Sequence, residues 1–159
     1  MDGDNAQYTG FHGDTFNCPA EINEARNGVM IDQYALNPEP GGEGEFRGGK
    51  GIYLDYHILA DDWWLTAMYS RSRYGPWGLN GGNEGSTNYI RIIRKNGREE
   101  VLNTCTGLAL GKDDVIRIVT ANGGGFGDPK ERPREKVRED VKNGYISPDQ
   151  ARDVYGLTP

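Results

Sequence analysis

The chain has 159 residues, a formal net charge of −6 and 24 glycines, which are about 15 % of its residues and twice the ordinary share. This length fits one domain, and three Trp, nine Tyr and four Phe exclude an intrinsically disordered chain. The acidic balance excludes nucleic acid as a favourable partner, and the lack of a run of about 18 apolar residues excludes a membrane span. Residues 1–62 have a net charge of −9 and residues 63–159 a net charge of +3. Such an asymmetry can indicate a docking face, although solvated surface is its commoner cause.

Residues 1–28 form the first segment, which we expect to be an irregular arm because no hydrophobic period is sustained there. Its start lacks the basic and apolar regions of a secretory signal. The two cysteines, Cys18 and Cys105, lie far apart and outside any Cys-x-x-Cys motif, which favours reduced thiols. The sequence therefore predicts a cytoplasmic protein.

Residues 29–129 form the predicted β-domain. Its candidate strands cover residues 29–36, 51–60, 63–70, 89–94, 99–102, 108–110 and 115–120. Within residues 51–60, apolar side chains alternate with more polar ones, which is the period of a strand with one buried face. Residues 63–70 follow after a short Asp61-Asp62 turn and are predicted to be the neighbouring strand. Asn96-Gly97, between two strand-like runs, is the strongest short-range hairpin signal.

Three glycine-rich loops, at 41–51, 75–82 and 123–127, interrupt these strands, and residues 130–159 change to helical patterns. One helix is predicted over residues 133–143, where two valines are four positions apart. A second begins at Ser147, which starts a capping box with proline at the first helical position. The predicted fold is mainly β, a sandwich or barrel of six to eight short strands with glycine-rich loops and a C-terminal tail of two short helices, in one structural domain.

Two of the glycine loops carry residue types that suit a small anion. The backbone amides of Gly123, Gly124 and Gly125 follow a strand and precede a helix start, where they could surround a phosphate or carboxylate. Arg47 and Lys50 add two cations to the first loop. Walker and dinucleotide-binding spacings are both absent and neighbouring carboxylates offset the charge, so structural turns are the favoured alternative in both loops.

The soft metal ligands of the chain are His12, Cys18, His57 and Cys105. Their spacing matches no metal-site signature, so no metal site is predicted. His57 falls on the polar face of its strand, where a solvated or hydrogen-bonded histidine is expected. There is no Gly-x-Ser-x-Gly nucleophile motif, and the Asp-Asp pairs in the turns are consecutive, so their side chains diverge. These patterns alone predict no self-contained active site.

Several short blocks of the sequence are distinctive enough to compare with known families. They are PEPGGEGEFRGGKGI at 38–52, GPWGLNGG at 75–82, GGGFGDP at 123–129, the ending from Arg132 to Leu157, and NCPAE at 17–21 near the start. The four blocks from residue 38 onward resemble, in the same order along the chain, the C-terminal part of the hydantoinase B family. NCPAE resembles the family's segment just upstream of that part. That family includes N-methylhydantoinases, 5-oxoprolinases, caprolactamase, and the acetone and acetophenone carboxylases, in which an A-type subunit uses ATP to phosphorylate a carbonyl or amide oxygen.

The resemblance implies partners. A full B-type subunit is several times longer, so this chain is expected to complete the B-type fold in trans beside larger A-type and B-type subunits. Acetophenone carboxylase includes a subunit of this size, which implies a structural or assembly role in converting acetophenone and bicarbonate to benzoylacetate. A subunit of a cyclic amide hydrolase and a free-standing anion-binding module are the alternative functions.

The resemblance also limits what is expected of single residues. ATP with Mg or Mn is expected in the complex, whereas none is assigned to this chain. The matching motifs are mainly glycine turns, so no catalytic residue is carried over from the family. Trp63, Trp64 and Trp77 are candidate anchors for a partner, because aromatic residues dominate such interfaces. Packing in the chain's own core is the alternative for these three residues.

Overall fold

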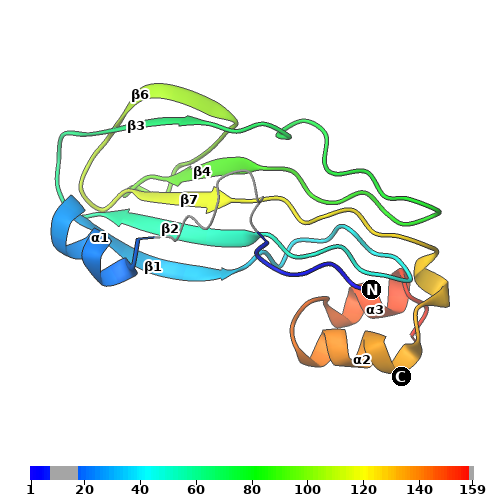
Figure 1. The fold of residues 1–159 in the computed structure, drawn as a ribbon. Helices are drawn as coiled ribbons and strands as arrows, with labels where there is room; N and C mark the ends of the chain where they lie inside the picture. Colours follow the sequence, from blue (N-terminus) through cyan, green and yellow to red (C-terminus); the bar gives the residue numbers. More distant parts are fainter. Residues whose placement is uncertain (8–17, 158–159) are drawn as a thin grey trace.

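Seven strands carry the fold of the described residues, 1–7 and 18–157, in the computed structural model (Figure 1). They are β1 (Val29–Leu36), β2 (Ile52–Ile58), β3 (Trp63–Met68), β4 (Tyr89–Ile93), β5 (Glu99–Leu102), β6 (Thr104–Leu110) and β7 (Val115–Val119). Five form one antiparallel sheet in the order β1-β2-β7-β4-β5, and β3 and β6 form a second sheet. The predicted fold class is confirmed, as a sandwich of two open sheets rather than a closed barrel.

The main core lies between the two sheets. Its buried residues are Val29, Ile58, Ile90, Ile92, Leu110 and Ile116. Ile90 and Ile92 illustrate the pattern, because they are two positions apart on β4 and both are fully buried, while Arg91 between them is not. Full burial of one such side chain stabilises the fold by about 1.5–3 kcal/mol, so this alternation holds the sheets together.

β3 does not pair with β2, so the prediction of a neighbouring strand after the Asp61-Asp62 turn is wrong. β2 pairs with β1 along one edge and with β7 along the other, which leaves it no free edge. Asp62 takes a left-handed φ of 62°, and the chain then crosses to the second sheet, where Trp63 lies opposite Leu110 of β6.

The hairpin predicted at Asn96-Gly97 is confirmed. β4 and β5 are antiparallel, with Ile93 opposite Glu99. Gly97 has a φ of 83°, which a residue with a side chain rarely adopts. The turn is local, so its residues were sufficient to define it.

The three glycine-rich loops run side by side, away from the sheets, and pack backbone against backbone (Figure 1). A Cβ at Gly42 would lie 2.0 Å from the carbonyl oxygen of Gly123, and one at Gly48 would lie 2.2 Å from the same atom. A Cβ at Gly124 would lie 2.2 Å from the carbonyl oxygen of Trp77. The segments 37–51, 72–88 and 120–129 therefore form one tightly packed unit, which we call the glycine bundle.

Backbone hydrogen bonds complete the glycine bundle. The amide of Gly42 donates to the carbonyl of Glu84 at 2.8 Å, and the amide of Asn83 donates to the carbonyl of Glu43 at 2.7 Å. The amide of Gly125 donates to the carbonyl of Asn83 at 2.9 Å. The glycine excess therefore serves close packing, because a side chain at these positions would separate the segments.

Helix α1 (Ala20–Asn27) occupies the end of the segment 1–28, where the sequence predicted irregular chain. None of its residues is buried, so it lacks the apolar stripe that a sequence pattern detects. Its ends carry local signals instead: Pro19 precedes it, and Gly28 ends it with a left-handed φ of 61°.

The two predicted C-terminal helices are confirmed as α2 (Arg134–Lys142) and α3 (Pro148–Asp153), after a short 3-10 helix, η2 (Pro129–Glu131). Ser147 and Gln150 form the predicted capping box of α3. A second small core joins the two helices; it consists of Val137, Ile146, Ala151 and Tyr155. In the part of the chain described, every helix is too short or too polar to cross a membrane.

Candidate functional site

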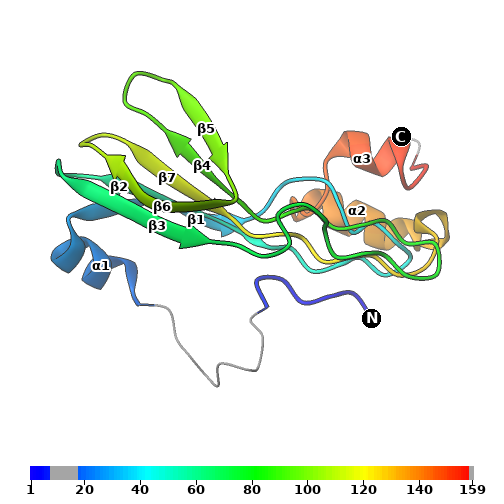
Figure 2. The same ribbon diagram turned by 90° about the horizontal axis from the view of Figure 1, so that it is seen from above.

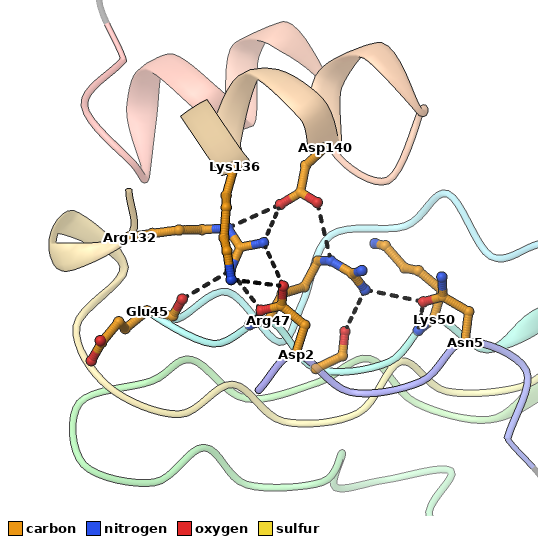
Figure 3. A network of polar contacts seen from close by, with 9 residues as sticks. Asp2, Asn5, Glu45, Arg47, Lys50, Arg132, Lys136 and Asp140 are labelled. Atoms are coloured by element: carbon orange, nitrogen blue, oxygen red, sulfur yellow. Dashed lines mark hydrogen bonds and ion pairs between the residues drawn. The ribbon is translucent and has the colours of Figure 1, made fainter. Parts of the chain in front are cut away.

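Arg47, one of the predicted anion-binding cations, lies at the centre of a buried polar network (Figure 3). Its side chain is 7 % exposed. Nη1 donates to Asn5 Oδ1 at 3.0 Å and to the carbonyl of Gly48 at 2.9 Å, and Nε lies 3.5 Å from Asp140 Oδ1. The guanidinium also stacks 4.5 Å from the ring centre of Tyr145. Arg47 therefore joins the N-terminal segment and the region of α2 to the glycine bundle.

Arg132 joins the same three parts of the chain and was not singled out by the sequence as a site residue. Arg132 directly follows η2, whose N-cap residue, Asp128, accepts a side-chain hydrogen bond from the amide of Lys130. Its Nη1 donates to Asp2 Oδ1 at 2.6 Å and to the carbonyl of Glu45 at 2.8 Å. Its Nε donates to Asp140 Oδ2 at 3.0 Å. The side chain of Arg132 is 1 % exposed, so these bonds form away from water.

The network changes the acidity of Asp2. Burial alone would raise the pKa of this carboxyl, but hydrogen bonds from the Arg132 side chain and the Arg47 backbone amide oppose that effect. The charges of Arg132 and Lys136 act in the same direction, and the pKa falls to about 2. Asp2 is therefore ionised in the folded protein at neutral pH, and its carboxylate pairs with the Arg132 guanidinium while accepting a hydrogen bond from the Arg47 backbone amide.

Lys50, the second predicted cation, is also buried, and its Nζ donates to the carbonyl of Glu39 at 2.9 Å. Burial lowers the pKa of its ammonium, although the charge of Glu43 opposes the shift. Lys50 lines a cavity of about 680 Å³ together with Asp4, Gly123 and Leu54. The fold therefore brings two of the five predicted anion-binding residues to one cavity wall.

The backbone amides of the third glycine loop are partly engaged within the chain. Gly123 donates to the carbonyl of Gly49 at 2.8 Å, and Gly125 donates to the carbonyl of Asn83 at 2.9 Å. An anion at this loop would have to compete with both bonds. Anion binding by the loop stays a prediction, and the contacts present serve the packing of the glycine bundle.

A second polar cluster, also missed by the sequence, lies where the large sheet meets the glycine bundle. Glu39 Oε1 accepts hydrogen bonds from the Tyr53 hydroxyl, at 2.9 Å, and from the Tyr89 hydroxyl. Burial, then hydrogen bonds with Tyr89 and Glu39, raise the pKa of the Tyr53 hydroxyl. Arg117 stacks 5.2 Å from the Tyr53 ring and holds the carboxylate of Asp55 with bonds of 2.8 and 2.6 Å. The proline-flanked Glu39 was the available sequence signal, but no local pattern links it to two distant strands.

The three tryptophans predicted as partner anchors lie in different surroundings. Trp63 is half-buried and packs against the main core, as in the alternative of core packing given for the three tryptophans. Trp64, on the outward side of β3, is 55 % exposed, and Trp77, in the glycine bundle, is 69 % exposed. The described chain leaves both of these rings largely uncovered, and their role as anchors stays a prediction.

The soft metal ligands that the structure describes are His57, Cys18 and Cys105. His57 Nδ1 lies 3.1 Å from Asp32 Oδ2 and its Nε2 lies 3.6 Å from Asp113 Oδ1, so the predicted hydrogen-bonded histidine is confirmed. Cys18 and Cys105 are free thiols, and His12 lies outside the described residues. Within residues 1–7 and 18–157, no group of three or more His, Cys, Asp or Glu side chains is arranged to hold a metal ion.

Comparison with known proteins agrees with this architecture. The chain is 33 % identical to the beta subunit of the caprolactamase of Pseudomonas jessenii over 86 % of its own length. It is 31 % identical over 92 % of its length to a protein from another Pseudomonas strain that is named as the B component of a D-/L-hydantoinase. It covers 24 % of the first protein and 25 % of the second. The chain therefore spans about a quarter of the length of the curated relatives it matches.

Solved structures show the same relationship. The crystal structure of the ATP-dependent caprolactamase from Pseudomonas jessenii matches 91 % of the chain with a TM-score of 0.74 and 30 % identity. A nucleotide-free acetone carboxylase matches 99 % of it with a TM-score of 0.85 and 21 % identity, which establishes a shared fold. The chain covers 26 % and 25 % of these two proteins. The model of the hydantoinase B/oxoprolinase family matches residues 1–129, and the chain belongs to this family.

Proposed function

We propose that this chain is a small subunit of a multi-subunit, ATP-dependent enzyme and that it completes a hydantoinase-B-type fold in trans. One observation carries the proposal: the relatives match 86–99 % of this chain with only about a quarter of their own length. The partners are then the remainder of a B-type fold and an A-type subunit that uses ATP. The location that we propose for the complex is the cytoplasm.

The role that we propose for the chain itself is structural. Arg47, Arg132 and Lys50 are buried and hold together segments of this chain. The described residues do not fit a metal site, so the proposal includes no step at a metal bound here. The ATP and the Mg or Mn that accompanies it are assigned to the larger subunits.

The reaction that we propose is the ATP-dependent carboxylation of an aromatic ketone, acetophenone and bicarbonate giving benzoylacetate. The structural match to acetone carboxylase over 99 % of this chain supports the B-type fold that such an enzyme needs. Hydrolysis of a cyclic amide is the second candidate. It is favoured by the higher identities, 31 % and 33 %, to proteins named as hydantoinase and caprolactamase subunits.

Reconstitution tests both parts of the proposal. The chain is co-expressed with the A-type and B-type polypeptides encoded nearest to it, and the purified complex receives ATP with either acetophenone and bicarbonate or hydantoin and caprolactam. Mass spectrometry then detects benzoylacetate or the ring-opened acids. Benzoylacetate as the product supports the carboxylase, and ring-opened acids support the second candidate. Full activity of the two larger polypeptides without this chain contradicts the role as a subunit.

A further inference from the structure

The glycine bundle has two unlike sides. Helices α2 and α3 lie along one side, and the segment 72–88 lies on the opposite side (Figures 1 and 2). The helical side is closed by polar contacts: Gln150 of α3 donates to Glu43 Oε1 at 3.0 Å, and Asp140 of α2 accepts from Arg132. The chain thus covers one side of the bundle with its own C-terminal helices.

The segment 72–88 and its neighbour present apolar side chains outward. Trp77 is 69 % exposed, Leu79 is 55 % exposed and Phe126 is 43 % exposed. Leu79 and Phe126 form a β-bridge, and the backbone of Trp77 packs against Gly124, so the three residues belong to adjoining backbone segments. Contiguous exposed apolar patches, especially those rimmed by polar residues, mark interaction sites on soluble proteins.

Two arginines lie shortly before Trp77 in the sequence, and one of them contacts its ring. The guanidinium of Arg71 lies 5.2 Å from the ring centre of Trp77, and that of Arg73 lies 5.5 Å from the ring centre of Tyr74. The side-chain hydrogen bond of Arg71 goes to the carbonyl of Gly75, at 3.5 Å. In the described chain, neither arginine forms an ion pair with a carboxylate. Both positive charges therefore remain available to an acidic group from outside.

We propose that the Trp77 surface, formed by Arg71, Arg73, Trp77, Leu79 and Phe126, is where the larger B-type polypeptide docks; this rests on the proposed function. The occupant is an apolar surface with carboxylates at its rim, which would pair with the two arginines. Two observations select it: the chain is about a quarter of its relatives' length, so most of the B-type fold is external to it, and the surface offers unpaired cations beside exposed rings. Trp, Tyr and Arg are the residue types that most often dominate binding energy.

Photo-cross-linking in the native complex tests the proposal. The tagged full chain, with Trp77→p-benzoylphenylalanine, is expressed in its own organism, irradiated and purified. We expect a covalent adduct with the B-type polypeptide, identified by mass spectrometry. The matched control is Val101→p-benzoylphenylalanine on β5, which is 57 % exposed and lies outside the Trp77 surface. A B-type adduct from position 101 and none from position 77 overturns the proposal.

A pair of charge reversals provides a second measurement. Arg71→Glu should reduce recovery of the B-type polypeptide with the tagged chain at least tenfold, whereas Arg98→Glu, on the exposed β4–β5 turn, should leave it within twofold. Equal recovery with both variants overturns the proposal while the proposed function stands. If the unaltered tagged chain recovers no B-type polypeptide, both fail. A thermal unfolding curve confirms that each variant is folded.

Discussion

Arg132 holds the carboxylate of Asp2 at two points, with N–O distances of 2.6 and 3.0 Å, although the two residues are 130 positions apart. The contact fastens the start of the chain to the point where the glycine bundle passes into the C-terminal helices (Figure 3). Because Arg132 also pairs with Asp140, a single guanidinium bridges two carboxylates that are far apart in the sequence. The stability of the bundle should therefore depend strongly on this side chain.

Arg132→Leu should lower the free energy of unfolding by about 3–5 kcal/mol, because it leaves the buried carboxylate of Asp140 without its closest cation. Chemical denaturation followed by tryptophan fluorescence measures the change. Arg134→Leu is the control: Arg134 is exposed and its side chain donates to the carbonyl of Gly156. A loss from Arg132→Leu no larger than that of the control would contradict the assignment.

The depressed pKa of Asp2 predicts a particular pH dependence of stability. The pKa of this carboxyl is about 2 in the folded chain and has its ordinary value of 3.8 in the unfolded chain, so the unfolded state binds the proton first as pH falls. The stabilisation by Asp2 is complete above about pH 5 and is lost as the pH falls through about 4 to 2. The difference in unfolding free energy between the unaltered chain and Asp2→Asn should shrink over that range. A difference that stays constant from about pH 6 to about pH 2 would exclude this linkage.

Gly48→Ala should destabilise the fold by about 1–3 kcal/mol, as expected for overpacking. Its Cβ would lie 2.2 Å from the carbonyl oxygen of Gly123, and neither backbone can shift without separating the segments of the glycine bundle. Gly111→Ala is the matched control, because a Cβ there meets only the side chain of Asp61 at 3.5 Å. The midpoint of urea denaturation compares the two variants; equal midpoints would show that the bundle tolerates a side chain at Gly48.

The neighbouring tryptophans of β3 should respond differently to truncation. Trp63→Ala should cost roughly 2–4 kcal/mol of stability, since Trp63 packs against the main core and leaves a void when removed. Trp64→Ala should change the stability by less than about 0.5 kcal/mol, since its ring is mostly exposed. Thermal unfolding of both variants checks the prediction, and equal losses would show that Trp64 also contributes to the core.

The features that the sequence predicted well are local. The Asn96-Gly97 hairpin and the capping box from Ser147 to Gln150 are set by contacts within four residues, so their residue types suffice. Period-two alternation located β2 within residues 51–60 for the same reason, whereas the strand predicted at 108–110 missed the first four residues of β6 (Thr104–Leu110). The sequence did not predict helix α1, because none of its residues is buried and a helix without an apolar stripe has no periodic signal.

The candidate sites required more than local pattern. Arg47 and Lys50 were recognised as cations among glycines, but the sequence did not show their partners. Arg47 contacts Asn5 and Asp140, and Lys50 donates to the carbonyl of Glu39. Arg132 was named only as the start of the C-terminal block and not as a site residue, because its partner Asp2 lies 130 positions away. Such long-range pairs depend on how the segments pack, which no spacing along the chain encodes.

Composition, turn chemistry and strand periodicity thus predicted from the sequence alone a glycine-rich β-domain, sandwich or barrel, with a helical tail, and the tertiary structure resolved it into two open sheets. Only the tertiary structure showed which strand edges are free to pair. β2 is paired on both edges, so β3 pairs with β6 in the second sheet instead. The tertiary structure also explains why the loops are rich in glycine. The three loops lie so close together that a Cβ at Gly42 would be 2.0 Å from the carbonyl oxygen of Gly123. Steric exclusion between segments distant in sequence, which appears only in three dimensions, is the reason for their excess.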